Sequence, residues 1–399
     1  MSIIQPGSTL GILGSGQLGR MFVIAAKQMG YRVHVLSPDA DSPAGQVADR
    51  EFVADDSDAA TITEFAKSVE AATIEFENIP ISTMELVEQY APVRPGSGVL
   101  RCIQNRIDEK SMLTNIQVPV PKFRAVRTED DLQAVSGDSY PAVLKTASTG
   151  YDGKGQRIVQ SSADLHEAWK SLGQAECVLE AFVEFDCEFS VIAARGSDGQ
   201  MVCYQPILNH HQNHILDISI SPGDLPESAT LQATEMIQNI AQSLDYVGVL
   251  CVEFFLLPSG DACVNEIAPR PHNSGHLTIE AHATSQFQQQ VRAVCGLPLG
   301  STEQKRPAAM ANLLGDCWQG QPPNWKSMLA HPNAALHLYG KAEARVGRKM
   351  GHITCLSETT AAAAEYVRRA RASLDSHDDS TAAASHTADD AHHRESYIR

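Results

Sequence analysis

Two glutamates flank a strong turn signal in the second half of the chain. Apolar runs surround the segment 258–261, Pro-Ser-Gly-Asp, so we predict a β-hairpin there. If the hairpin turns about the central Ser-Gly pair, Glu253 lies opposite Glu266, with Cβ atoms about 5 Å apart. Facing carboxylates repel each other unless a cation lies between them. Mg²⁺ uses one or two carboxylates plus phosphate oxygens, so the pair predicts a magnesium site, which Asn265 joins only if the strand bulges.

A compact polar group follows Glu266 directly. Arg270 stands between two prolines, and His272 and Asn273 come next. A stiffly held guanidinium suits a carboxylate, carbonate or phosphate, and the two neighbours add hydrogen-bond donors. We therefore expect this group to orient an anionic intermediate beside the metal.

A lysine and a glycine-rich segment form a second candidate site for phosphate. Lys145 ends a predicted strand over 141–145, and the segment 148–156 reads Ser-Thr-Gly-Tyr-Asp-Gly-Lys-Gly-Gln. Backbone N–H groups of such a loop and a lysine ammonium both bind phosphate oxygens. The residue order is not that of a Walker A loop. A surface turn with solvated lysines is the alternative interpretation.

Gly14, Gly16 and Gly19 form a third candidate, a G-x-G-x-x-G motif between a predicted strand and a predicted helix. A dinucleotide site also has an acidic residue at the end of the next strand. Here the acid is Asp39, which is displaced and follows a proline. The motif therefore allows three interpretations: NAD, another phosphate-bearing ligand, or a purely structural turn.

A basic island at 340–350 is conspicuous in an acidic chain. It contains Lys341, Arg345, Arg348 and Lys349. It is either a solvated loop or a set of cations that binds a substrate phosphate.

These residues need elements to position them. Strands separated by helices indicate βαβ units and a parallel sheet in the N-terminal part. A second region begins near 108, a third runs from about 297 to 372, and the segment 373–399 has few apolar residues and is predicted to be a disordered tail. The predicted strands and helices of the first region are 10–13, 20–29, 32–36, 61–70 and 72–77.

Composition excludes several classes of protein. The 399 residues are 43% hydrophobic and 20% charged, which excludes global disorder. The net charge of −17 argues against nonspecific nucleic-acid binding or an acidic membrane surface. No run approaches the length of a membrane span. The 9 cysteines are scattered without C-x-x-C spacing, which predicts a reducing, cytoplasmic location.

Four segments together resemble one family. The segments 11–20, 150–156, 265–276 and 347–352 are similar to those of 5-(carboxyamino)imidazole ribonucleotide synthetases, which are ATP-grasp ligases of purine biosynthesis. The similarity runs from about residue 8 to about residue 370. It implies a mixed α/β and α+β fold: an N-terminal Rossmann-like domain (1–107), a two-subdomain ATP-grasp domain (108–296, lid subdomain about 118–183) and a small β-rich C-terminal domain (297–372).

The resemblance also implies the reaction. ATP, bicarbonate and aminoimidazole ribonucleotide would give the carboxyamino product, ADP and phosphate by way of carboxyphosphate. ATP and Mg²⁺, or Mn²⁺ in its place, are the implied cofactors. A cytoplasmic homodimer, without nucleic-acid or membrane partners and with hand-off of the product to a mutase, is the implied assembly.

Residue roles carry over from the same resemblance. Glu253 and Glu266 would hold the metal, and Arg270, His272, Asn273 and Lys145 would act on the reacting groups. The residues implied to bind the nucleotide are Arg106, Lys145, Gly150, Tyr151, Asp152, Gly153, Lys154, Gly155, Gln156, Glu180, Ala181, Phe182, Val183, Glu188, His211, Asn265 and Glu266. Those implied to bind the ribonucleotide are Gly16, Gln17, Leu18, Glu77, Asn78, Asp152, Lys341, Arg345, Arg348 and Lys349.

Some alternatives remain open at this level. The residues around His211 depart from the family pattern, which lowers the weight of that assignment. Another ATP-grasp ligase that forms an acyl phosphate, of the biotin carboxylase or formate-dependent transformylase type, is the nearest rival function. A nucleotide-binding protein without turnover and an NAD-dependent oxidoreductase are more distant rivals.

Overall fold

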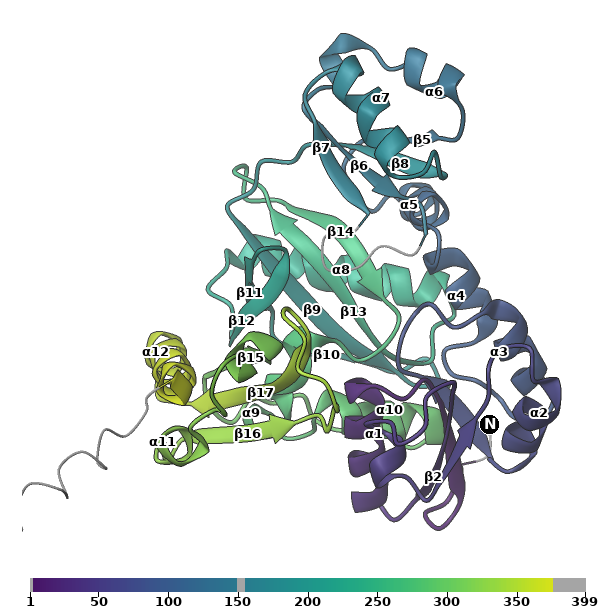
Figure 1. Ribbon diagram of the computed structural model, residues 1–399, viewed down its shortest axis with the longest axis vertical. Helices are drawn as coiled ribbons and strands as arrows, with labels where there is room; N and C mark the ends of the chain where they lie inside the picture. The colour runs from purple at the N-terminus through teal and green to yellow at the C-terminus, as the bar shows by residue number, and fades with distance from the viewer. Residues whose placement is uncertain (1–2, 149–154, 376–399) are drawn as a thin grey trace, which may run out of the picture.

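The N-terminal part of the chain folds around a parallel four-stranded sheet (Figure 1), in a computed structural model that describes residues 3–148 and 155–375. The strand order is β3-β2-β1-β4, and every pair is parallel. Fully buried strands β1 and β4 explain the unbroken apolar runs of the sequence. The elements are β1 (Thr9–Leu13), α1 (Gln17–Gln28), β2 (Arg32–Ser37), η1 (Gly45–Val47), β3 (Arg50–Val53), α2 (Ala59–Lys67), β4 (Ala71–Ile74), α3 (Ile81–Glu88) and α4 (Ser97–Ile103).

The strand predicted over 72–77 ends earlier, at Ile74. Glu75, Phe76 and Glu77 therefore leave the sheet at the carboxyl edge of its strands, where α/β folds usually bind ligands. This shorter strand is what brings two acidic side chains to the functional region.

A second, antiparallel sheet forms a separate lobe, drawn at the top of Figure 1. Its strand order is β5-β8-β6-β7, and α6 and α7 cover it through a cluster that includes Leu132, Leu165 and Trp169. The elements of this part are α5 (Arg106–Asn115), β5 (Phe123–Val126), α6 (Glu129–Gln133), η2 (Gly137–Ser139), β6 (Ala142–Thr146), β7 (Gln156–Val159), α7 (Ser162–Ser171) and β8 (Cys177–Ala181).

The central sheet has nine strands in the order β14-β13-β9-β11-β12-β15-β17-β16, with β10 paired to β9. Strands of the predicted C-terminal domain thus continue the sheet of the predicted second domain through the antiparallel pair β12–β15. The elements are β9 (Cys187–Arg195), β10 (Met201–Cys203), β11 (Ile207–Gln212), β12 (Ile215–Ser221), α8 (Glu227–Ser243), β13 (Gly248–Leu256), β14 (Ala262–Ala268), η3 (Asn273–Leu277), α9 (Thr278–Ala281), α10 (Gln286–Cys295), β15 (Ala308–Leu314), η4 (Gly315–Trp318), α11 (Trp325–Leu329), β16 (Ala334–Leu338), β17 (Lys349–Leu356), α12 (Thr360–Ala372) and η5 (Ser373–Asp375).

The hairpin predicted from the sequence is present as β13–β14, and Glu253 pairs with Glu266 as expected. The turn is centred slightly differently, because the N–H of Gly260 donates to the carbonyl of Leu257 and the loop closes on Asp261. A register shift after Glu253 restores the predicted pairing, since Phe254 faces Val264 rather than Asn265. Asn265 is therefore the bulged residue.

Helix α10 fastens the N-terminal domain to the rest of the molecule. It begins at a capping box formed by Ser285 and Gln288, and it ends at Gly296, whose φ of 69° suits glycine. Its buried face, which includes Phe287 and Val291, shares one apolar core with Phe22 of α1. This packing fixes the carboxyl edge of the parallel sheet relative to the central sheet.

The chain's terminal segment is ordered slightly further than predicted. Leu374, in the segment expected to be disordered, is buried in the C-terminal core, and its carbonyl accepts a hydrogen bond from the N–H of Asn324. The rest of that tail, 376–399, lies outside the described residues. All nine cysteines are free thiols, and no helix in the described part could span a membrane.

His282 is buried without polar partners behind the central sheet. It is 1% exposed, its ring meets the ring of Tyr204 edge-on at 5.1 Å, and neither ring nitrogen has a hydrogen-bond partner among the described residues. Burial, assisted by the charge of Lys305, lowers the pKa of His282 from 6.5 to about 4. The folded protein therefore holds this imidazole in its neutral form.

Protonation of His282 should destabilise the fold in acid. Between pH 6.5 and about 4 the unfolded chain binds a proton that the folded chain excludes, so stability falls by about 1.4 kcal/mol per pH unit from this group. In His282→Phe, which cannot be protonated, we expect the melting temperature to fall less between pH 7 and pH 5 than in the parent chain. Identical falls in the two proteins would contradict this account.

Candidate active site

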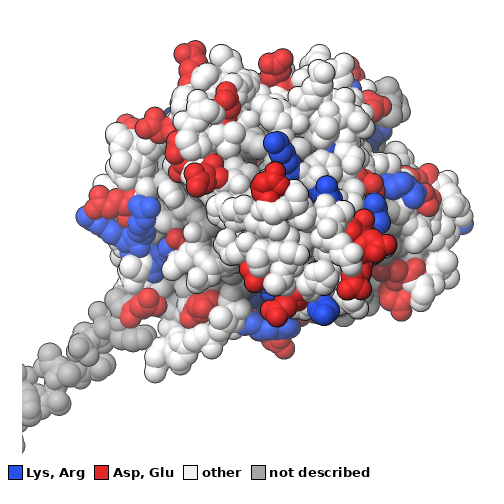
Figure 2. Space-filling view, turned by 90° about the horizontal axis from the view of Figure 1, so that it is seen from above, with Lys and Arg blue, Asp and Glu red and all other residues white. Residues whose placement is uncertain are grey.

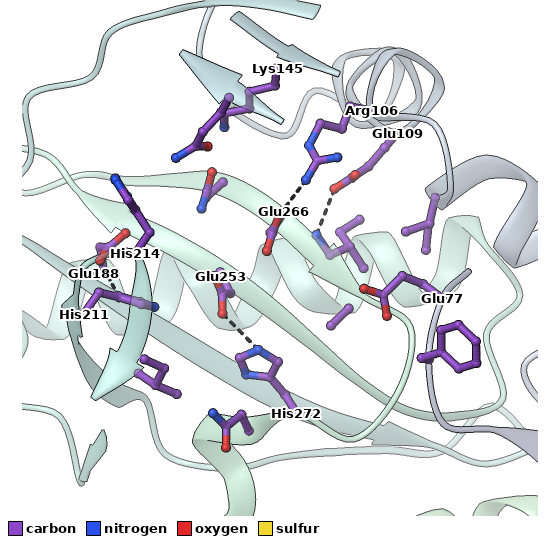
Figure 3. Close-up of a pocket in the computed structure, with 18 of the residues that line it drawn as sticks. Glu77, Arg106, Glu109, Lys145, Glu188, His211, His214, Glu253, Glu266 and His272 are labelled. Atoms are coloured by element: carbon purple, nitrogen blue, oxygen red, sulfur yellow. Dashed lines mark hydrogen bonds and ion pairs between the residues drawn. The ribbon is translucent and has the colours of Figure 1, made fainter. Parts of the chain in front are cut away.

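A cleft of about 1260 Å³ lies where the parallel sheet, the lobe sheet and the central sheet meet (Figure 3). Most of the residues predicted from the sequence line it. They are Gln17, Leu18, Glu77, Asn78, Arg106, Lys145, Gln156, Phe182, Glu188, His211, Glu253, Asn265, Glu266, Arg270, His272, Asn273 and Lys349. Residues separated by more than 300 positions in the chain therefore share one cavity.

The paired carboxylates of Glu253 and Glu266 lie on the floor of the cleft, on neighbouring strands of the hairpin (Figure 3). His272 Nε2 lies 3.1 Å from Glu253 Oε1, and Arg106 Nη2 lies 3.6 Å from Glu266 Oε2. These ion pairs use one oxygen of each carboxylate. Each carboxylate is therefore balanced by one cationic side chain at the edge of the pair.

The two carboxyl groups respond differently to the same surroundings. Burial acts to raise both pKa values, but His272 outweighs it at Glu253 and lowers the pKa of that carboxyl. At Glu266, whose side chain is still 48% exposed, partial enclosure in the cleft and then the charge of Glu253 raise the pKa, against the opposing effect of Arg106. Glu266 is thus the carboxylate that a divalent cation would stabilise most.

These residues fit a magnesium ion better than a metal held entirely by protein. No group of three His, Cys, Asp or Glu side chains in the described parts of the chain is arranged to hold a metal. Two carboxylates with the bulged Asn265 beside them match the preference of Mg²⁺ for few protein oxygens plus substrate phosphates.

Two lysines share one buried carboxylate at the side of the cleft. Glu180, on β8, lies 3.0 Å from Lys145 Nζ and 3.3 Å from Lys110 Nζ. Burial raises the pKa of Glu180, but Lys145 and Lys110 outweigh that effect and lower it. The carboxylate therefore holds the Lys145 ammonium at the cleft and does not itself line the cavity.

Arg270 is held by an acidic residue of the N-terminal domain. Its Nε donates to Glu77 Oε2, and its side chain is 16% exposed. Burial opposes the charge of Arg270, yet Glu77 keeps its pKa above the usual range. This contact between the parallel sheet and the loop after β14 aims a guanidinium into the cleft.

His272 and Asn273 lie beside Arg270 as predicted. Burial opposes protonation of His272, but Cys251 and then the Glu253 carboxylate raise its pKa. Both amide atoms of the Asn273 side chain are buried without a partner among the described residues, although the residue lines the cleft. Unpaired buried polar atoms are costly, so this amide is suited to a bound ligand.

The far end of the cleft combines aromatic rings with an acid–histidine pair. Phe185 and Phe255 stack with ring centroids 4.7 Å apart. Near them, His211 Nδ1 lies 2.6 Å from Glu188 Oε2. Burial lowers the pKa of His211, but Glu188 more than compensates and raises it. The region can therefore accept a flat ring next to polar groups.

The glycine motif of α1 is occupied by a protein carboxylate. The N–H groups of Gly16 and Gly19 donate to the two oxygens of Glu75, the latter at 2.8 Å. A Cβ on Gly14 would lie 2.5 Å from the Glu75 side chain, which explains a small residue there. In this structure both amide groups are bonded to a protein carboxylate, which favours the structural-turn interpretation of the motif.

Several predicted residues lie away from the cleft lining. Arg345 is paired with Glu343 at 2.8 Å, and Arg348 Nη1 donates to the carbonyl of Glu343 at 2.9 Å. Of the basic island, the cavity lining includes only Lys349. The remaining predicted residues outside the lining are Gly16, Gly155, Glu180, Ala181, Val183, Lys341, Arg345 and Arg348. Gly150, Tyr151, Asp152, Gly153 and Lys154 lie outside the described residues.

The sequence analysis missed some residues of the site. Glu75 fills the glycine motif, and Glu109 and Lys110 on α5 contact the strand that carries Glu266. Burial raises the pKa of Glu109 to about 7, although Lys110 opposes the shift. The spacing of Arg106, Glu109 and Lys110 places them on one helix face, and that pattern could have marked them.

Family models match nearly the whole described chain. A ribonucleotide synthetase preATP-grasp domain matches residues 8–104, an ATP-grasp domain matches 111–287, and a phosphoribosylaminoimidazole carboxylase C-terminal domain matches 308–366.

Individual relatives agree with the models. An N5-carboxyaminoimidazole ribonucleotide synthase of Bacillus subtilis is 42% identical over 89% of this chain and 93% of its own length. A bifunctional purine synthesis protein of Dictyostelium discoideum is 40% identical over 88% of this chain, which spans only 37% of that larger protein.

Solved structures of the same family are also similar to this chain. An N5-carboxyaminoimidazole ribonucleotide synthetase in complex with ADP superimposes with a TM-score of 0.88 at 42% identity, covering 93% of this chain and 98% of that chain. The enzyme of Aspergillus clavatus, in complex with ADP and 5-aminoimidazole ribonucleotide, gives 0.84 at 30% identity, covering 92% and 98%. With this fold, this cleft and these relatives, the chain belongs to the family of N5-carboxyaminoimidazole ribonucleotide synthases.

Proposed function

We propose that this chain carboxylates the amino group of 5-aminoimidazole ribonucleotide with bicarbonate at the expense of ATP. A bicarbonate oxygen attacks the γ-phosphorus, ADP leaves, and carboxyphosphate forms. Carboxyphosphate then breaks down to CO₂ and phosphate, and the amine attacks CO₂ and loses a proton. The products are N5-carboxyaminoimidazole ribonucleotide, ADP and phosphate.

The observation that carries this proposal is the placement of Glu253, Glu266 and Arg270 in one cleft. The two carboxylates are suited to a metal–phosphate complex, and the guanidinium, held by Glu77, is suited to an anion next to it. Phosphoryl transfer depends mainly on such positioning and charge neutralisation.

We assign Arg106 and Lys145 to the phosphates of the nucleotide. Lys145 is held by Glu180, and Arg106 already contacts the metal-site carboxylate Glu266. Phe182, Phe185 and Phe255 supply apolar surface at the cleft end, which supports a site for the adenine there. Glu188 and His211 are assigned to the ribose side.

Mg²⁺, or Mn²⁺ in its place, is assigned to Glu253 and Glu266, with Asn265 beside them. When bound, the ion would neutralise charge on the ATP phosphates. His272 is already within 3.1 Å of Glu253 and would orient that carboxylate. Asn273, with its unpaired buried amide, is assigned to the carboxyphosphate.

For the ribonucleotide, we assign Gln17, Leu18, Glu77 and Asn78 on the N-terminal domain and Lys349 on the C-terminal strands. Each of them lines the cleft. Because Glu75 takes the amides of Gly16 and Gly19, the phosphate is assigned to Lys349, the residue of the basic island that lines the cleft, rather than to the glycine motif. Asp152 would complete this site.

The wider setting is inferred from membership of the family. We propose a homodimer in the cytoplasm that passes its acid-labile product to a mutase. On the face that Figure 2 shows, Lys and Arg are scattered among Asp and Glu, and we propose no nucleic-acid partner.

The reaction predicts a substrate-dependent ATPase. ADP release from Mg²⁺ATP and bicarbonate should rise strongly when aminoimidazole ribonucleotide is added, and labelled bicarbonate should enter an acid-labile product. A rate of ADP release that does not change when the ribonucleotide is added would indicate that another molecule accepts the carboxyl group. Absence of ADP release would favour a binding protein.

Glu266→Gln should abolish ATP turnover, with a loss of at least about 100-fold, because a neutral amide replaces the carboxylate assigned to the metal. ADP release by the steady-state assay is the measurement. Glu358→Gln, at an exposed ion pair with Arg306, is the matched control and should behave as the parent chain. Turnover near normal in Glu266→Gln would refute the metal assignment.

Arg270→Lys keeps the charge but loses the fork that reaches Glu77 and the cleft. We expect kcat to fall on the order of 100-fold or more, with a small change in the KM for ATP. The measurement is of kcat and of the KM for ATP, both at saturating ribonucleotide. Weaker ATP binding with kcat unchanged would place Arg270 at the nucleotide instead.

A further inference from the structure

The carboxylate assigned to the metal lies on an edge strand. β14 is the outermost strand of the central sheet, so one side of its backbone has no neighbouring strand. The bulge at Asn265 also interrupts the ladder to β13 immediately beside Glu266. An edge strand with a bulge is the least constrained part of a sheet, yet Glu266 must hold a defined orientation.

Helix α5 supplies the missing contacts along this edge. The N–H of Ile267 donates to Glu109 Oε1 at 2.8 Å, and Lys110 Nζ donates to the carbonyl of Asn265 at 3.3 Å. Figure 3 shows the Glu109 contact next to the Arg106–Glu266 pair. Side chains of one helix face therefore hold the backbone on both sides of Glu266 and its carboxylate as well.

The same helix also links Glu266 to Lys145. Lys110 is 2% exposed and lies 3.3 Å from Glu180, which in turn lies 3.0 Å from Lys145. Glu109 is 3% exposed. Burial of a charged side chain is costly unless its partners compensate for the lost hydration, and removing either residue would leave a buried polar group without its partner. Burial this complete therefore indicates a specific structural role for Glu109 and Lys110.

We propose that Glu109 and Lys110 are positioning residues of the metal site, which hold the bulged 265–267 backbone so that the Glu266 carboxylate faces Glu253. The proposal rests on the proposed function, because it assigns a divalent cation to Glu253 and Glu266. Glu109 lines the cleft and Lys110 does not, and we assign the action of each residue to its contact with the backbone of β14.

The test is the affinity of the full chain for Mn²⁺ in the presence of ADP, measured by electron paramagnetic resonance. Glu109→Leu removes the acceptor of the Ile267 N–H and should weaken Mn²⁺ binding about 10-fold or more, as losses of outer contacts at metal sites do. Glu109→Gln keeps an acceptor oxygen and should bind within about threefold of the parent chain. ADP binding without metal should be unchanged in both variants.

Two further variants keep the test decisive. Lys110→Met removes the contact to the Asn265 carbonyl and should also weaken Mn²⁺ binding, even if Glu109→Leu does not fold. Ser111→Ala, one position along the same helix, removes only a bond to the carbonyl of Ile107 and should leave Mn²⁺ affinity unchanged. Thermal unfolding of each variant separates lost affinity from lost structure.

The outcomes separate this inference from the function it rests on. If the parent chain binds Mn²⁺ and Glu266→Gln does not, the metal assignment holds. Folded Glu109→Leu and Lys110→Met with parental affinity would then overturn the positioning role alone, as would an equal loss in Glu109→Gln and Glu109→Leu. If Glu266→Gln binds Mn²⁺ as well as the parent chain, the metal assignment and the positioning role both fail.

Discussion

Repulsion between the carboxylates of Glu253 and Glu266 is the constraint around which the cleft is organised. Like charges on adjacent strands cost more in a partly desolvated cleft than in water. His272 and Arg106 each balance one carboxylate, while Lys145 and Arg270 place further positive charge around the pair. The folded chain thus places two neighbouring carboxylates in the cleft and surrounds them with positively charged side chains from several elements.

Chain topology brings the required groups to this pair from distant parts of the sequence. β4 ends at Ile74 and releases Glu77 toward Arg270, while the continuation of the central sheet into β17 delivers Lys349. The shared core of α1 and α10 keeps these contributions in register. The geometry of the cleft therefore depends on the apolar core between α1 and α10 as well as on the polar contacts in the cleft itself.

Much of this arrangement could be predicted from local sequence. The remaining features could not be predicted, for identifiable physical reasons. Turn chemistry and alternation were enough to pair Glu253 with Glu266, because hairpin contacts are local. The contact of Ile267 with Glu109 could not be derived, since it joins β14 to a helix residue 158 positions earlier in the chain. The glycine motif left a phosphate site and a structural turn both open, and the bonds from its amide groups to the side chain of Glu75 could be revealed only by the tertiary structure.

The pairing of β12 with β15 makes the C-terminal strands part of the central sheet. Ending the chain after α10 would strip β12 of its neighbour and expose a row of unpaired backbone groups, a template for aggregation. The antiparallel lobe, by contrast, has its own sheet and its own core. Any attempt to recombine modules between relatives should therefore exchange the lobe as a unit and keep the nine-stranded sheet intact.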